Sequence, residues 1–131
     1  MKWIEGQNYC NALKNSYLAS IESATENSYL LNYLLRYHED VFVGYNDIAA
    51  EGKWVWINSG REGKYMYWAA GEPSNRGAGE DCGVVIGMAA PPTYQGKWDD
   101  VPCQHRYPFL CERGKVSRIL SKATFCLSET N

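Results

Sequence analysis

The most informative part of the chain reads Gly71-Glu72-Pro73-Ser74-Asn75-Arg76-Gly77-Ala78-Gly79-Glu80-Asp81-Cys82, and it is completed by Trp98-Asp99-Asp100-Val101-Pro102-Cys103. Both stretches are predicted to be loops, because Gly, Pro, Ser, Asn and Asp interrupt regular structure. Together they hold five carboxylates, on Glu72, Glu80, Asp81, Asp99 and Asp100. Crowded carboxylates with no thiolate or imidazole among them favour a hard cation with about 6–8 oxygen ligands, which indicates calcium rather than zinc.

These two stretches resemble a known family. Glu-Pro-x, a Gly-rich turn, Gly-Glu-Asp-Cys and then Trp-x-Asp before a second cysteine are similar to the sugar-binding half of a C-type lectin domain. Upstream, Leu18-Ala19-Ser20-Ile21-Glu22-Ser23 with Glu26-Asn27, and Val43-Gly44-Tyr45, resemble its helical half. The resemblance runs from about Trp3 to Glu112. It implies an α+β, C-type lectin-like fold with two helices flanking small antiparallel sheets, a long calcium-binding loop region and two disulfides.

Composition limits the class of protein. At 131 residues the chain has the length of one domain, and 45% hydrophobic with 14% aromatic residues indicates a folded globule. The net charge of -2 and the lack of a basic run give no reason to expect nucleic acid or an anionic membrane surface. No apolar run approaches the roughly 20 residues of a membrane-spanning helix.

The five cysteines indicate an extracellular protein. They form no C-x-x-C pair and no Cys/His set with zinc spacing, which favours a disulfide framework in a secreted chain. No apolar leader precedes Trp3, so a secreted protein would have lost its leader. The resemblance implies the pairs Cys10–Cys111 and Cys82–Cys103. Cys126 remains, either for an intermolecular disulfide in a homo-oligomer or as a free thiol.

The residue spacing predicts two helices and several short strands. One helix is expected over Trp3–Leu13, and a second starts at the capping box Ser23-Ala24-Thr25-Glu26 and runs up to His38. Strands are expected over Leu18–Ile21, Val41–Gly44 and Trp54–Trp56. The residues expected in the core are Trp54, Trp56, Trp68, Val84, Val85, Ile86 and Phe109.

The domain boundaries are expected at 1–113 for the lectin-like domain and 114–131 for a C-terminal tail. The family usually has a first strand that pairs with the last one, and only nine residues precede Cys10. We therefore expect the strand Tyr107–Cys111 to lack its partner and to leave an open edge. In the tail, Val116, Ile119, Leu120 and Ala123 fall at helical spacing, so a short amphipathic helix and a frayed tail are both open.

The resemblance also implies a ligand set for each of two calcium sites. The primary ion, which also carries the sugar, would use Glu72, Ser74, Glu80, Asp99 and Asp100, and Pro73 is expected to be cis. A possible auxiliary ion would use Asp47, Glu51, Asn75, Glu80 and Asp81, with Asn75 where an aspartate is usual. From spacing alone, Asp47 and Glu51 are more simply explained as a solvated turn.

The implied function is calcium-dependent sugar binding. Mannose-type sites of the family read Glu-Pro-Asn with Trp-Asn-Asp, whereas this chain has Glu72-Pro73-Ser74 and Trp98-Asp99-Asp100, so its set of hydrogen-bond donors favours galactose over mannose. The alternative is a module of the same fold that binds a protein and no sugar. Tyr94 could pack on a sugar, although a solvated loop aromatic is the simpler interpretation. His38 and His105 belong to no catalytic motif, and an enzyme is not expected.

Overall fold

The computed structural model describes residues 1–74, 79–113 and 124–128. Its centre is one mixed sheet with the strand order β1-β6-β2-β4-β5, to which β3 and β7 add by pairing with β2 and β6. The strands are β1 Ser16–Leu18, β2 Val41–Asn46, β3 Val55–Trp56, β4 Cys82–Val85, β5 Trp98–Val101, β6 Phe109–Arg113 and β7 Thr124–Ser128. All described pairs are antiparallel except β2 with β6, so the expected separate antiparallel sheets are joined into one.

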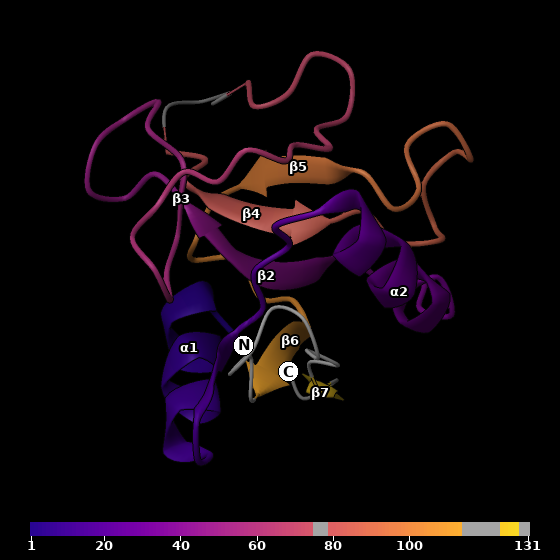
Figure 1. The fold of residues 1–131 in the computed structure, drawn as a ribbon. Coiled ribbons are helices and arrows are strands. Elements are labelled where there is room, and N and C mark those ends of the chain that lie inside the picture. Colours follow the sequence, from indigo (N-terminus) through magenta and orange to yellow (C-terminus); the bar gives the residue numbers. More distant parts are fainter. Residues whose placement is uncertain (75–78, 114–123, 129–131) are drawn as a thin grey trace.

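Two helices lie beside this sheet (Figure 1). The first, α1, spans Trp3–Ala12, and the second, α2, spans Ala24–Leu34. Ser23 caps α2 as expected, because its side chain accepts a hydrogen bond from the N–H of Glu26. The helix ends at Leu34 and not near His38; the N–H of Tyr37 donates to the carbonyl of Leu34, three residues back, and the carbonyls of Tyr37 and His38 accept hydrogen bonds from the loop after β4.

The core has two parts, one for each helix. Leu30 and Leu34 of α2 belong to a cluster with Trp54, Trp56 and Trp98, whereas Trp3 and Cys10 of α1 belong to a cluster with Phe42 and Phe109. The expected core residues are buried, with Trp68 partly buried against the first cluster. Of the two disulfides, Cys10–Cys111 joins α1 to β6, as the resemblance implied.

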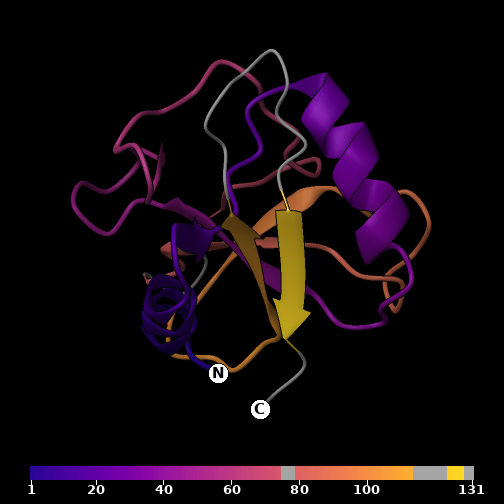
Figure 2. The ribbon, with the colours of Figure 1, turned by 60° about the horizontal axis from the view of Figure 1, so that its bottom comes forward.

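The strand β6 has partners that the sequence did not predict. It pairs with β1 over Ser16–Leu18 and with β7 along its whole length, and Figure 2 shows β6 and β7 side by side. The expectation of an unpaired last strand is therefore wrong, as is that of a helix or a frayed tail for residues 124–128. Residues 116–123, on which the helical spacing was read, lie outside the described part. Cys126 is placed through its backbone alone, opposite Cys111.

Two loops leave opposite ends of the β4–β5 pair. Residues 57–74 and 79–81, between β3 and β4, belong to the long loop region at the top of Figure 1. The hairpin loop 86–97 lies beside α2, where Gly96 packs against Leu31. Tyr94 is 42% exposed in that hairpin loop, which agrees with a solvated aromatic. No helix in the described residues is long and apolar enough to cross a bilayer.

Candidate metal centre

The strand pair β4–β5 brings the two informative stretches together. In its antiparallel register Asp99 lies opposite Val84 and Asp100 opposite Gly83. The disulfide Cys82–Cys103 fixes the end of β4 to the segment after β5, as the resemblance implied. Because Glu80 and Asp81 directly precede β4, the carboxylates of both stretches are carried to the same end of the sheet.

Glu72, Asp99 and Asp100 form the first carboxylate cluster. One oxygen from each side chain lies within 4.8 Å of the others, and Asp100 is only 1% exposed. The Glu72–Pro73 peptide bond is cis, as expected. Ser74 links this cluster to a fourth acid: its N–H donates to Asp100 Oδ1 at 3.1 Å and its hydroxyl donates to Glu80 Oε1 at 3.4 Å.

The first cluster is electrostatically unfavourable when it holds no ion. Burial, and then repulsion from Glu72, raise the pKa of Asp99 to about 7. Burial, and then a hydrogen bond with the Asp100 side chain, raise the pKa of Glu72 above its ordinary value. Oε1 of Glu72 is buried and has no hydrogen-bond partner among the described residues. These carboxylates therefore gain a counter-charge if a cation binds between them.

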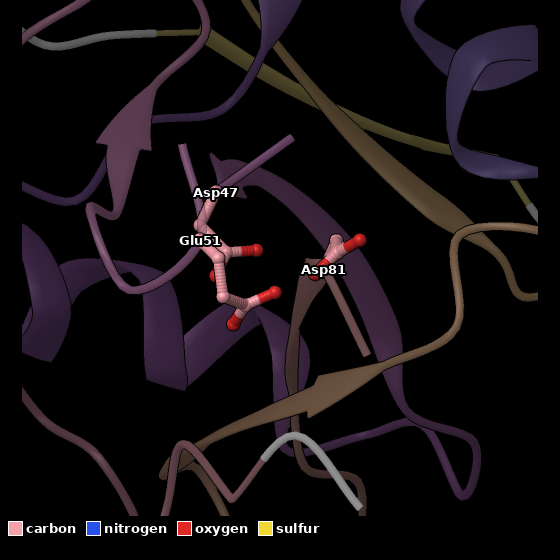
Figure 3. A group of neighbouring side chains, drawn as sticks. All are labelled: Asp47, Glu51 and Asp81. Carbon is pink, nitrogen blue, oxygen red and sulfur yellow. The ribbon is translucent and has the colours of Figure 1, made fainter. Parts of the chain in front are cut away.

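Asp47, Glu51 and Asp81 form the second carboxylate cluster, shown in Figure 3. Asp47 follows β2, and its N–H donates to the carbonyl of Asp81 at 3.0 Å. Its Oδ2 accepts a hydrogen bond from the N–H of Gly52 at 2.8 Å, in a turn where Gly52 has φ +85°. This turn leaves Glu51 exposed and places one of its carboxylate oxygens within 4.8 Å of those of Asp47 and Asp81.

Buried oxygens of the second cluster also lack partners. Oδ1 of Asp47 and Oδ1 of Asp81 are buried without a hydrogen-bond donor among the described residues. Burial raises the pKa of both carboxyls, and for Asp81 the neighbouring Asp47 adds to the rise. Asn75, the remaining residue expected here, lies outside the described part of the chain.

Both clusters have the donor set of a hard cation. All the expected ligands that the structure describes offer oxygen, in agreement with the chemistry of calcium. Each group contains a buried carboxylate oxygen that has no hydrogen-bond donor among the described residues, namely Oε1 of Glu72 in the first and Oδ1 of Asp47 and of Asp81 in the second, and an ion could coordinate there.

Comparison with known proteins decides the family. A family model described as the lectin C-type domain matches residues 1–113. The chain belongs to the C-type lectin domain family. C-type lectin domains generally bind Ca²⁺, and this domain has two acidic groups that could hold such an ion.

Relatives of this C-type lectin domain come from distant animals. C-type lectin BfL-2 of Bungarus fasciatus is 32% identical over 84% of this chain and 69% of its own length. Lectin BRA-3 of Megabalanus rosa is 34% identical over 86% of this chain and 65% of its own length, so the chain spans about two thirds of either protein. Salivary C-type lectin 1 of Aedes albopictus is 30% identical over 85% of this chain and 75% of its own.

Solved structures share the fold of this C-type lectin domain. The human scavenger receptor C-type lectin carbohydrate-recognition domain superposes with a TM-score of 0.76 at 28% identity, covering 88% of this chain and 84% of that one. The C-type lectin CEL-I from Cucumaria echinata gives a TM-score of 0.72 at 26% identity, covering 85% and 81%. The expected α+β lectin-like fold is therefore confirmed.

Sequence reasoning named the acidic side chains of this C-type lectin domain and missed the backbone groups that hold them. The N–H groups of Ser74 and Gly52 fix Asp100 and Asp47. Every residue type except proline has such a donor, so little in the sequence marks it. For Gly52 alone there is a signal, because a glycine between Glu51 and Lys53 permits the positive φ that the turn needs.

Proposed function

We propose that this chain is a calcium-dependent carbohydrate-binding protein whose sugar site is the first carboxylate cluster. The observation that carries the proposal is the convergence of Glu72, Asp99 and Asp100 within 4.8 Å around a buried oxygen without a donor. Relatives named as lectins, and a structural neighbour named as a carbohydrate-recognition domain, support the same function.

The residues proposed to hold the primary ion are Glu72, Ser74, Glu80, Asp99 and Asp100. Calcium, when bound, would coordinate two neighbouring sugar hydroxyls directly. The carboxylate oxygens that remain would accept hydrogen bonds from those hydroxyls, and the N–H of Ser74 keeps Asp100 in place by its 3.1 Å bond. Asp47, Glu51, Glu80, Asp81 and Asn75 are proposed for an auxiliary ion that would hold the loop.

The sugar is proposed to be of the galactose rather than the mannose type. Asp99 and Ser74 stand where the mannose-type pattern has amides, and a carboxylate donates no hydrogen bond. Loss of two donors would weaken mannose binding by about 0.5–1.5 kcal/mol for each one. The double substitution Ser74→Asn with Asp99→Asn should then raise the affinity for mannose.

The setting of the proposed function is extracellular and not catalytic. Two disulfides suit a secreted protein. A lectin needs no general acid, and the relatives of this chain are named as lectins. Self-association through Cys126 is part of this proposal, since two of the five cysteines pair with two others and leave it over.

A glycan array read in calcium and in chelator tests the proposed function. Signals on galactose-type glycans that vanish in chelator are the expected result. Asp100→Ala should lose them, while Glu39→Ala, which removes an exposed carboxylate elsewhere, should retain them. If the protein takes up calcium and no glycan gives a signal, the protein-binding alternative replaces the lectin.

A further inference from the structure

The strand β7 places a further cysteine beside the Cys10–Cys111 disulfide. In the antiparallel register of β6 with β7, Cys126 is the Cα partner of Cys111. On its other side Cys111 pairs with Leu18 of β1, so it lies in the middle of a row of three residues. The other four of the five cysteines are joined in two disulfides, and the remaining one therefore lies opposite one of these disulfides.

The backbone register alone brings Cys126 within disulfide distance of Cys111. Directly opposite residues of an antiparallel pair have Cα atoms about 4.5 Å apart at positions without mutual hydrogen bonds, and about 5.5 Å apart at positions with them. Both values lie inside the range of about 4.4–6.8 Å that disulfides span. Directly opposite residues also belong to the same face of a sheet. Cys111 therefore has two possible disulfide partners, Cys10 on α1 and Cys126 on β7.

The Cys10–Cys111 disulfide is shielded from reagents in solution. Cys10 is fully buried and Cys111 is 2% exposed, in the core cluster that also holds Trp3 and Phe109. A thiolate has to reach a disulfide sulfur in order to displace its partner, so small thiols in solution should attack this disulfide slowly. A cysteine of the neighbouring strand needs no path from solvent. The chain itself thus supplies the thiol that is best placed to attack.

We propose that Cys126 is the exchange partner of the Cys10–Cys111 disulfide. The Cys126 thiolate attacks Sγ of Cys111, and the bond between Cys10 and Cys111 breaks as the bond between Cys111 and Cys126 forms. Cys10 leaves as the thiolate and takes up the proton that Cys126 has lost. One disulfide and one thiol are present before and after this step, so it needs no oxidant or reductant. The exchange goes beyond the proposed lectin function, because neither carboxylate cluster takes part in it.

The exchange changes which elements the disulfide holds together. Cys10–Cys111 fastens α1 to β6 across a sequence separation of 101, whereas Cys111–Cys126 fastens β7 to β6 across the 15 positions from 111 to 126. A longer closed loop restricts the unfolded chain more, and a shorter loop closes more readily. The first form is therefore the more stable one, and the second form releases α1 from its covalent link. An intermolecular disulfide at Cys126 uses the same sulfur, so association and exchange exclude each other in any one chain.

A count of free thiols in a Cys10→Ser variant tests whether Cys111 and Cys126 can pair. The variant is refolded in a glutathione redox buffer, and its monomer is alkylated in denaturant without reduction. We expect no labelled cysteine, because Cys111 pairs with Cys126 once Cys10 is gone. The matched control, Cys10→Ser with Cys126→Ser, should carry one label or one glutathione, on Cys111. Labels or glutathione on both Cys111 and Cys126 of the single variant would overturn the proposal.

Disulfide mapping of the parent protein tests the exchange itself and does not depend on a variant that folds. The parent monomer is incubated without redox reagents, quenched with acid, alkylated and digested without reduction. Two linked peptide pairs that share Cys111 are expected, one with Cys10 and one with Cys126. The pair with Cys126 should form about tenfold faster at pH 7.5 than at pH 6.5, because a thiol with a pKa of about 8.5 gains thiolate in that proportion. Its absence at every time, or a rate that ignores pH, would overturn the exchange.

The Cys82–Cys103 disulfide is the internal control for both measurements. Its Cys82 lies opposite Val101 and Asn46 in the sheet, so no cysteine is in register with it. This linked pair should stay intact in every sample. Cys111 found joined to Cys82 or Cys103 as often as to Cys126 would show general disulfide scrambling, and the assignment of Cys126 as the exchange partner would then be wrong.

Discussion

Replacing Asp100 with alanine is expected to remove most of the stabilisation that calcium gives to the folded chain. The side chain is 1% exposed, and its Oδ1 holds the N–H of Ser74. The substitution deletes a ligand of the proposed primary ion and one acceptor inside the loop. The ion-free protein should suffer less than the calcium-loaded one, because repulsion from Glu72 and Asp99 is relieved when Asp100 is lost.

The magnitudes follow from linkage. An ion that binds only the folded state stabilises it by about 2.7 kcal/mol at a hundredfold excess over its Kd. In a domain of this size 1 kcal/mol shifts Tm by roughly 3–5 °C, so the parent should gain about 10 °C in calcium. In chelator, the lost hydrogen bond of Ser74 costs about 1 kcal/mol, partly offset by the relieved repulsion.

Thermal melts followed by tryptophan fluorescence, in millimolar calcium and in chelator, measure the gain in Tm from calcium and the loss of stability in the ion-free protein. Glu39→Ala is the matched control, since it removes an exposed carboxylate that lies in neither cluster. Calcium should raise the Tm of this control by as much as it raises that of the parent. An Asp100→Ala protein that gains the full 10 °C or so would show that Asp100 is not a ligand and refute the assignment.

Acidification should stabilise the ion-free protein, because the pKa of Asp99 is about 7 in the folded chain and about 3.9 in the unfolded chain. The stabilisation from protonating Asp99 is complete below about pH 3.9 and is lost as the pH rises through about 7. The Tm measured in chelator should therefore rise as the pH is lowered from 8 to 5, and a fall in Tm would contradict the burial of this carboxyl. Gly87→Ala should cost about 2–3 kcal/mol in urea unfolding, because a Cβ there would overlap the carbonyls of residues 38 and 39, and a silent substitution would disprove that close approach. Ser23→Ala should cost about 1 kcal/mol through the lost helix cap, and unchanged urea unfolding would argue against that cap. A covalent dimer on a non-reducing gel that disappears in Cys126→Ser is expected, and a purely monomeric parent would contradict association through this cysteine.

The convergence of carboxylates could be predicted from the sequence because the residue types in these stretches are chemically restrictive. Clustered carboxylates between glycines and a cis proline have few structural uses, and the structure places Glu72, Asp99 and Asp100 together. The interpretation of Asp47 and Glu51 needed the family resemblance, because two acids in a turn are common. Their convergence on Asp81 depends on a strand pairing that spacing does not encode.

Element boundaries were harder to predict, since tertiary contacts set them. The apolar run Leu18–Ile21 indicated a strand, but the ladder with β6 covers Ser16–Leu18. Beyond Leu18 the backbone turns to other partners: Ala19 donates to Leu110, and Ser20 donates to the buried carboxylate of Glu112. The apolar run therefore marked burial rather than the register of the strand.

The C-terminal strand was missed because two patterns compete in the tail. The spacing of apolar residues in 116–123 indicates a helix. The run Thr124-Phe125-Cys126-Leu127-Ser128 that follows alternates in the way that is typical of a strand. The edge that β6 would leave without a first strand is filled by this run. An exposed strand edge favours pairing with another segment, and here that segment is β7.

A crystal structure grown with calcium and galactose would show directly whether the first carboxylate cluster binds sugar. We expect an ion bound by Glu72, Asp99 and Asp100, with two sugar hydroxyls on that same ion. We also expect that the ion at the second cluster, if one is seen, touches no sugar. A sugar bound away from the first cluster, or calcium found at the second cluster alone, would contradict the proposed lectin site.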